Sequence, residues 1–150
     1  MLGKKKFFTP EEEKQLVEAI EAAEKNTSGE IKIHVDKYCK INPYIRAVDV
    51  FEKAGMTDTE LRNGVLFYIA TEDHKFAIAG DEGIDAKVPE GFWDNVKEHV
   101  LAKFKEGKYA DGLSEGIGMA GEQLKTYFPY QSDDINELPD DISYGEGDSK

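Results

Sequence analysis

Three acidic residues follow the end of a short apolar segment. Residues 76–79 are Phe-Ala-Ile-Ala, the segment stops at Gly80, and Asp81, Glu82 and Asp85 follow within five residues. Carboxylate oxygens are the ligands that calcium and magnesium prefer in proteins. The same composition is also common in solvated turns, and its spacing differs from that of an EF-hand loop. The spacing therefore leaves both a cation site and a plain turn open.

The elements that must position these acids are predicted from hydrophobic periodicity and capping residues. Thr9 and Glu12 form a capping box, which predicts the start of a helix. Residues 31–36 alternate between apolar and polar side chains, which predicts a strand with one wetter face near a sheet edge. Residues 65–70 are apolar throughout, which is typical of a central strand covered on both faces. The predicted order is helix 9–26, strand 31–36, helix 42–55, strand 65–70, strand 76–79 and helices 92–104 and 113–128.

The order of these elements predicts the topology of the sheet. The first two strands flank a helix, so we expect a parallel pair with a right-handed crossover. The third strand follows the second after a short turn and returns antiparallel. The fold class is therefore α/β, a three-layer α/β/α arrangement with a mixed, mostly parallel sheet and flanking helices.

This topology brings three glycine-containing segments to one edge of the sheet. Two parallel strands begin at this edge and the antiparallel strand ends there, which places residues 28–30, 62–64 and 80–85 together. The cluster contains no Cys or His, so its oxygen ligands favour calcium or magnesium over zinc. The candidate ligands at this edge are Glu30, Asn63, Asp81, Glu82 and Asp85.

The opposite edge of the sheet is the competing location for a site. Ligands of open α/β sheets usually bind outside the carboxyl ends of the parallel strands, which is this second edge. Its residues have the composition of an ordinary hairpin and lack glycine, so we favour the first edge. The polar residues collected there are Asp36, Lys37, Tyr38, Glu72, Asp73 and His74.

The charge of the chain limits the classes of partner. The 150 residues carry a net charge of −12, which argues against nucleic acid and anionic membrane surfaces. Residues 131–150 contain seven acids and one lysine, so about half of the excess lies there, and we expect an acidic disordered tail. The sequence shows neither a signal peptide nor an apolar stretch long enough to span a membrane. We therefore expect a cytoplasmic monomer.

Four segments resemble the TPM domain family. They read SGEIKIHV, RNGVLFYIA, FAIAGDEGID and FKEGKYADGLSEGI, in this order, and the resemblance covers roughly residues 10–128. It divides the chain into an N-terminal arm (1–8), a TPM-like domain (9–130) and the acidic tail (131–150). The family is known from a thylakoid-lumen protein with reported acid phosphatase activity and from membrane-anchored bacterial and animal relatives. Its fold is a mixed sheet with helices on its faces.

The resemblance implies divalent-cation binding, because several relatives bind calcium or related cations. The family's acidic corner falls on Gly80, Asp81, Glu82 and Asp85, and its pre-helix acidic motif implies Asp111 as a further ligand. Many members read G-Y-G-L-E-G at the corner, where this chain reads G-D-E-G-I-D. Many also carry a signal peptide and a membrane helix, and this sequence shows neither.

Three functions compete. The first is a non-catalytic protein that binds calcium or magnesium at the acidic edge. The second is a metal-assisted phosphatase, with Arg62 as the cation placed to assist; it ranks lower because the neighbouring carboxylates repel phosphate. The third is an interaction module that uses the acidic tail to bind a basic protein partner.

Overall fold

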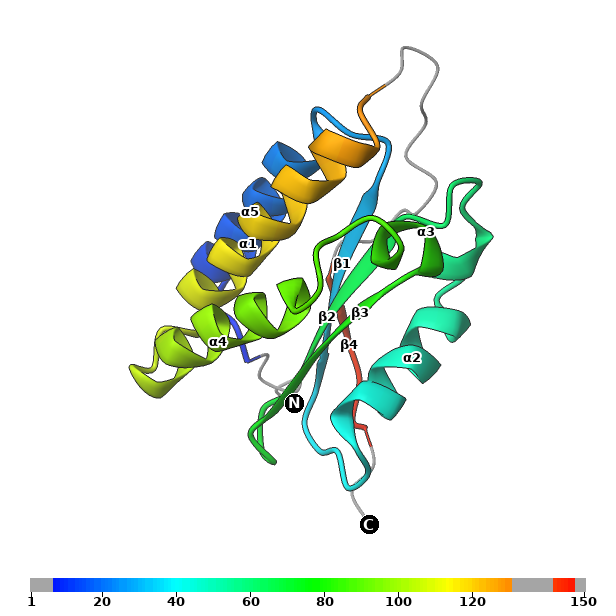
Figure 1. The fold of residues 1–150 in the computed structure, drawn as a ribbon. Helices are drawn as coiled ribbons and strands as arrows, with labels where there is room; N and C mark the ends of the chain where they lie inside the picture. The colour runs from blue at the N-terminus through cyan, green and yellow to red at the C-terminus, as the bar shows by residue number, and fades with distance from the viewer. Residues whose placement is uncertain (1–6, 131–141, 148–150) are drawn as a thin grey trace.

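The computed structural model describes residues 7–130 and 142–147, and its elements follow the predicted order with additions (Figure 1). The predicted capping box at Thr9 and Glu12 begins α1, and Asn42 caps α2 by accepting from two backbone amides. A short helix, α3, directly follows the third strand. The elements are α1 (Pro10–Glu24), β1 (Glu30–Asp36), α2 (Pro43–Lys53), η1 (Met56–Asp58), β2 (Gly64–Ala70), β3 (Lys75–Gly80), α3 (Glu82–Asp85), α4 (Phe92–Lys105), α5 (Tyr109–Tyr127) and β4 (Ile142–Tyr144).

The sheet has the strand order β3-β2-β1-β4. β1 pairs with β2 in parallel, with Glu30 opposite Gly64, and β2 pairs with β3 antiparallel, with Val65 opposite Gly80. Both pairings and the interior position of β2 confirm the predicted topology. The expected position of β1 near an edge is wrong, because β4 pairs with it in parallel from Ile142 to Tyr144.

Helices cover both faces of the sheet, which confirms the three-layer α/β/α fold (Figure 1). On one face, α1, α4 and α5 pack on side chains such as Ile33 and Phe67. On the other face, α2 packs on Leu66 and Tyr68. This second core also contains Cys39, which is fully buried and whose thiol donates to the Ile41 carbonyl oxygen at 3.3 Å.

The polar face of β1 is buried, contrary to the wetter face that its alternation predicts. Lys32, His34 and Asp36 are 7%, 8% and 0% exposed. This face lies on the α2 side of the sheet, where Arg46 of α2 bonds to Asp36 and Ser143 of β4 bonds to His34. The alternation therefore marks a buried polar network rather than a solvated face.

The C-terminal region departs from the expected disordered tail at residues 142–147. Ile142 and Tyr144 pack against the larger core, and the backbone amide of Gly145 donates to the Val35 carbonyl oxygen at 2.8 Å. The expectation of disorder is wrong for these residues. Residues 131–141 and 148–150 lie outside the described residues, as do residues 1–6 of the expected N-terminal arm. At the end of that arm, Phe8 is only 3% exposed and belongs to the core.

In the part of the chain that the structure describes, every helix is too short or too polar to cross a membrane.

Candidate functional site

The three predicted segments meet at one edge of the sheet. The side-chain amide of Asn63 donates to the Ser28 hydroxyl at 3.2 Å, which joins the segments before β1 and β2. The amide of Asp81 donates to the Gly64 carbonyl oxygen at 2.9 Å, which joins the starts of β2 and α3. The three segments therefore lie together as the sheet topology predicts, and the acidic corner, residues 80–85, packs against the turn before β2.

Two backbone features hold the acidic corner in place. Arg62 adopts a left-handed conformation with φ of 52°, and its carbonyl oxygen accepts from the Gly83 amide at 2.8 Å. A Cβ at Gly83 would lie 2.1 Å from the Leu61 carbonyl oxygen. Only glycine therefore lets α3 approach this turn closely enough for Asp81 to reach Arg62.

Arg62 is the counter-ion of the corner. Its Nε and Nη2 atoms donate to the two oxygens of Asp81 at 2.7 and 2.9 Å, a bidentate pair, and Nη1 lies 3.3 Å from Glu82. The Asp81 hydrogen bond, together with the charges of both acids, raises the pKa of Arg62. Asp81 is 6% exposed and also caps α3 through the Glu82 amide at 2.8 Å. Asp81 is thus a fixed, buried carboxylate, whereas Glu82 is exposed.

Asp85 is the acid at the corner that Arg62 does not reach. Its Oδ1 accepts from the Trp93 indole nitrogen at 2.8 Å and lies against the backbone of Gly80. Desolvation of this carboxyl raises its pKa and the charge of Asp81 adds to the rise, while the Trp93 hydrogen bond opposes it. The corner therefore holds more negative charge than one guanidinium balances.

The remaining candidate ligands divide between two places. Glu30 and Asn63 are buried at the edge of the corner, at 5% and 1% exposure. Asp111 lies elsewhere: it accepts from Gln15 at 2.8 Å at the start of α5. The neighbouring Tyr109 lines a cavity of about 270 Å³ with Thr71 and Lys75, at the β2–β3 hairpin, the far end of β3 from Gly80.

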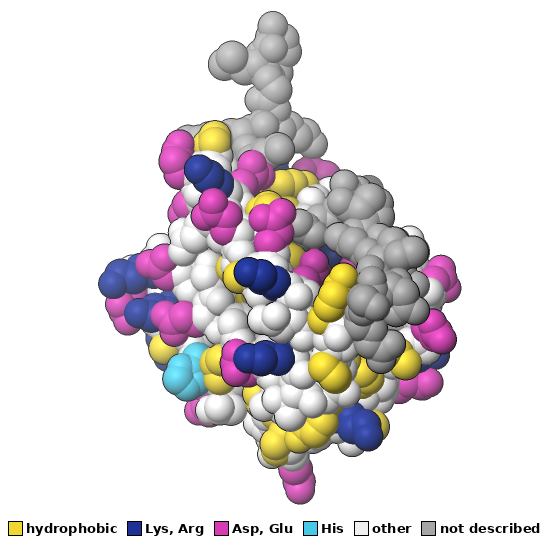
Figure 2. All heavy atoms as spheres, turned by 90° about the horizontal axis from the view of Figure 1, so that it is seen from above, with side chains coloured by type: hydrophobic (Ala, Val, Ile, Leu, Met, Phe, Trp, Pro, Cys, Tyr) yellow, Lys and Arg dark blue, Asp and Glu magenta, His cyan; other side chains and the backbone are white. Residues whose placement is uncertain are grey.

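The acids of the corner do not form a ready-made metal cage. Among the described residues, no three His, Cys, Asp or Glu side chains are arranged to hold a metal ion. Figure 2, which looks down on the α3 end of the molecule, shows acidic side chains interspersed with lysine and arginine side chains rather than gathered into one patch. A cation at this site therefore requires the side chains to rearrange.

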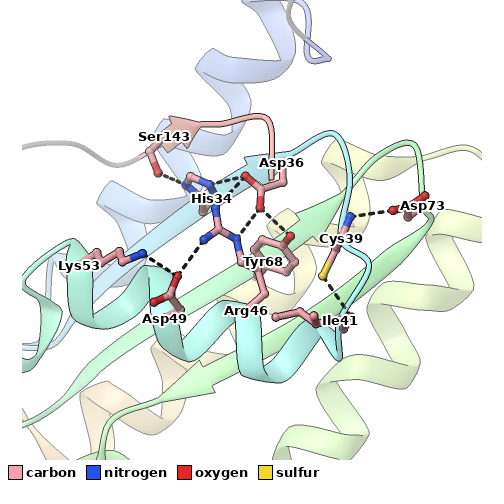
Figure 3. A network of polar contacts seen from close by, with 10 residues as sticks. All are labelled: His34, Asp36, Cys39, Ile41, Arg46, Asp49, Lys53, Tyr68, Asp73 and Ser143. Atoms are coloured by element: carbon pink, nitrogen blue, oxygen red, sulfur yellow. Dashed lines mark hydrogen bonds and ion pairs between the residues drawn. The ribbon is translucent and has the colours of Figure 1, made fainter. Parts of the chain in front are cut away.

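A second polar network lies on the α2 face and is centred on Asp36 (Figure 3). Asp36 accepts from Arg46 Nε at 2.9 Å, from the Tyr68 hydroxyl at 2.7 Å and contacts His34 Nε2 at 2.8 Å. Burial would raise the pKa of Asp36, but the bonds to His34, Arg46 and Tyr68 outweigh burial and lower it to about 2. Asp36 also raises the pKa of Arg46, although burial opposes this. The carboxylate is thus ionised and fully paired.

The network continues from His34 to the C-terminal strand. His34 Nδ1 lies 2.6 Å from the Ser143 hydroxyl, so Ser143, His34 and Asp36 are connected in the order of a Ser–His–Asp relay. Such a relay needs an aspartate whose charge is free to stabilise the imidazolium. Here Arg46 already neutralises Asp36, so the chain of bonds serves to attach β4 to β1.

The sequence places Asp36 among the polar residues of the opposite edge and does not identify its partners. The feature of the sequence that points to this contact is an acid at the end of a strand followed, ten residues later, by an arginine on the crossover helix. That spacing is compatible with a contact but does not require one, because it depends on how α2 is rotated over the sheet.

Comparisons with known proteins identify a family and a shared fold. The model of the TPM domain matches residues 3–123. The NMR structure of the BA42 protein from the psychrophilic bacterium Bizionia argentinensis is 48% identical and covers 97% of this chain and 100% of its own, with a TM-score of 0.86. No curated protein matches the chain.

Two more distant structures share the fold. The N-terminal domain of a protein from P. gingivalis is 17% identical, with coverage of 81% of this chain and 78% of its own and a TM-score of 0.65. The N-terminal domain of cg2496 from Corynebacterium glutamicum is 11% identical, with coverage of 86% and 80% and a TM-score of 0.65. At these identities the likeness concerns the fold.

Proposed function

The chain belongs to the TPM domain family, and from this premise we propose that it binds a divalent cation, calcium or magnesium, at Asp81, Glu82 and Asp85. The observation that carries the proposal is the charge imbalance of the corner. Arg62 pairs with Asp81 and Glu82 but does not reach the third carboxylate, Asp85, and the charge of Asp81 contributes to the raised pKa of Asp85. A divalent cation would supply the missing positive charge with the oxygen ligands it prefers.

In this proposal Arg62 occupies the position that the cation takes. Its side chain is 39% exposed, so its guanidinium can move into solvent when a cation binds Asp81. The Glu82 side chain is exposed and, among the described residues, contacts only Arg62, at 3.3 Å, so it is free to turn toward the cation. Asp85 would exchange its bond to Trp93 for the cation.

Neighbouring strand ends can complete the coordination sphere. Glu30 and Asn63 stand at the starts of β1 and β2, next to the corner, and water fills the remaining positions. Asp111 is not part of the proposed ligand set, because it lies at the other end of β3. Calcium tolerates such an irregular set better than magnesium does, so we propose calcium as the better ligand.

The test is a thermal and NMR titration of the metal-free protein with calcium and with magnesium at constant ionic strength. Binding to the folded state stabilises it by RT ln(1 + [L]/Kd), or about 2.7 kcal/mol at a hundredfold excess over Kd. The unfolding temperature should therefore rise, and the amide signals of residues 80–85 should shift. No thermal shift and no amide perturbation at millimolar cation would refute the proposal.

Charge-matched variants separate this site from a general effect of charge. Asp81→Asn with Asp85→Asn should abolish the thermal shift. Glu18→Gln with Glu72→Gln removes the same charge from exposed positions outside the corner and should leave the shift intact.

Arg62→Gln tests the competition between arginine and cation. Removing the guanidinium that competes for Asp81 and Glu82 should tighten cation binding. The metal-free variant should be less stable than the wild type, and the difference should shrink when cation is added. An unchanged affinity would show that the cation does not compete with Arg62.

The phosphatase alternative gains no such observation. The chain has two arginines: Arg46 is held by Asp36 and Asp49, and Arg62 by Asp81 and Glu82. The third alternative, a tail that binds a basic partner, is changed by the structure, since residues 142–147 of the tail bind the chain's own sheet.

A further inference from the structure

Residues 142–147, here called the C-terminal strap, bind β1 through a small set of specific contacts. The strap includes β4 and pairs with only three residues of β1, and its side chains and backbone remain partly exposed. A pairing of this length is marginally stable by itself. The strap is therefore a segment that can open locally while the rest of the sheet stays folded.

The backbone of the strap also forms hydrogen bonds at the end of β1 and just after it. The Gly145 amide donates to the Val35 carbonyl oxygen at 2.8 Å, and the Glu146 carbonyl oxygen accepts from Lys37 and Tyr38 at 3.2 and 3.0 Å. These bonds are available to any extended segment in the same register. The edge of β1 is thus a strand-binding site whose occupant is the chain's own strap.

The side chains on this edge select the sequence of the occupant. Ser143 bonds to His34 of the Asp36 network, as Figure 3 shows, and Tyr144 bonds to Glu13 of α1. Ile142 and Tyr144 bury apolar surface against the core. The edge therefore recognises an apolar residue, a serine and an aromatic residue in succession.

Two glycines complete the recognition pattern. A Cβ at Gly145 would lie 2.8 Å from Asp36 Oδ1, and a Cβ at Gly147 would lie 1.9 Å from the Tyr38 carbonyl oxygen. Gly147 also has φ of 77°, which favours glycine. Asp36 is held by three partners and the Tyr38 contact is a backbone atom, so neither can move easily to make room for a Cβ. The pattern is apolar-Ser-aromatic-Gly-X-Gly.

We propose that this edge of β1 is an interaction site for that pattern, and that its second occupant is the C-terminal strap of another copy of the chain. The strap that fits in cis fits in trans with the same contacts, because every recognition element lies on the acceptor. In cis it competes at an effective concentration on the order of millimolar, so the monomer dominates in dilute solution. Concentrating or tethering two copies would favour exchange.

The first experiment measures binding in trans with a fluorescent peptide of residues 140–150. The acceptor is the full chain with Gly145→Ala and Gly147→Ala, which cannot seat its own strap. The apparent Kd of a closed site is its intrinsic Kd divided by the open fraction, so the acceptor should bind about tenfold or more tightly than the wild type. Equal or weaker binding by the acceptor would overturn the proposal.

Matched controls confine the effect to the strap site. Gly118→Ala adds a methyl group at a glycine with open space around it and should leave peptide binding at the wild-type level. A peptide carrying Gly145→Val should not bind the acceptor. If the acceptor variant does not fold, isotope-labelled wild type titrated with the peptide should show shifts at residues 33–38 and 142–147, and unchanged signals would overturn the proposal.

The second experiment identifies another copy of the chain as the occupant. The acceptor variant is mixed with wild type, whose strap can open and enter the empty site. Sedimentation followed through a label on the acceptor variant should show a heterodimer when wild type is present at about millimolar concentration, where binding in trans matches the competition in cis, and a monomer when the labelled variant is alone. Peptide binding without a heterodimer would refute the second copy as the occupant.

Discussion

At the scale of single residues, Asp36 and Asp81 show two uses of a buried carboxylate. Each is paired with an arginine, and each has 6% exposure or less. Asp36 has three donors from three elements and holds β1, β2 and α2 together. Asp81 is bound by one arginine and a helix amide, beside another acid. The contacts of Asp36 are suited to holding the fold together, and those of Asp81 allow its arginine to be exchanged for another counter-ion.

Asp36→Asn should destabilise the protein at neutral pH by about 3 kcal/mol, because Arg46 would lose the fully buried carboxylate that compensates its partly buried charge. The cost should be visible as a lower urea midpoint. Asp49→Asn is the control, since Asp49 is 42% exposed and bonds to the same guanidinium. Its effect should stay below about 1 kcal/mol, as for other exposed ion pairs.

The effect of Asp36 on stability should depend on pH in a defined window. Its pKa of about 2 in the folded protein lies below the ordinary 3.8, so its contribution is complete above about pH 4 and is lost as the pH falls toward 2. The wild type should lose about 2 kcal/mol more than Asp36→Asn across this window, at 1.36 kcal/mol per pH unit. Parallel stability curves for the two proteins would contradict the assignment.

At the scale of elements, the docking of α3 depends on one position. Gly83 approaches the carbonyl oxygens of Leu61 and Arg62 so closely that a methyl group must push α3 away. This separation would also pull Asp81 from Arg62. The short helix and the ion pair are therefore two parts of the same structure.

Gly83→Ala should lower the free energy of unfolding by about 1–3 kcal/mol, the usual cost of overpacking. It should also weaken any response to calcium, because the corner would lose its shape. Thermal unfolding with and without calcium measures both effects. Gly118→Ala serves as the comparison, and equal stability of the two variants would show that the α3 contact accommodates the added methyl group.

Elements with long periodic patterns could be predicted from the sequence, and short ones could not. Residues 65–70 identified an interior strand because an unbroken apolar run needs cover on both faces. β4 has three residues in an acidic, polar region, and its stability depends on β1, more than a hundred residues earlier. Missing β4 also misplaced β1 at an edge of the sheet.

The same limit applies to the candidate site. Strand order sufficed to bring Asn63 and Asp81 together, because sheet topology fixes where strand ends lie. The pairing of Arg62 with Asp81, and of Asp85 with Trp93, depends on side-chain directions in a turn and a short helix. Asp111 was assigned through a family pattern, and the structure places it beside Gln15.

At the scale of the whole molecule, the sheet should open in two stages. β2 is paired along both sides and buried throughout, so its amides exchange with solvent only when the domain unfolds. The Gly145 amide belongs to the partly exposed strap and should exchange through local opening. Native-state hydrogen exchange should show Gly145 exchanging about a hundredfold faster than Phe67, or nearly 3 kcal/mol less protected. Equal protection would mean that the strap is an integral part of the sheet.

The buried thiol on the α2 face reports how often this side of the molecule opens. Cys39 is the chain's one cysteine, is fully enclosed, and donates to a neighbouring carbonyl oxygen. A thiol reagent can reach it only in molecules where the segment between β1 and α2, or α2 itself, has moved away from the sheet. The labelling rate of the unmodified protein therefore measures how often this face opens, and no engineered probe is needed. Movements confined to the opposite face of the sheet do not change this rate.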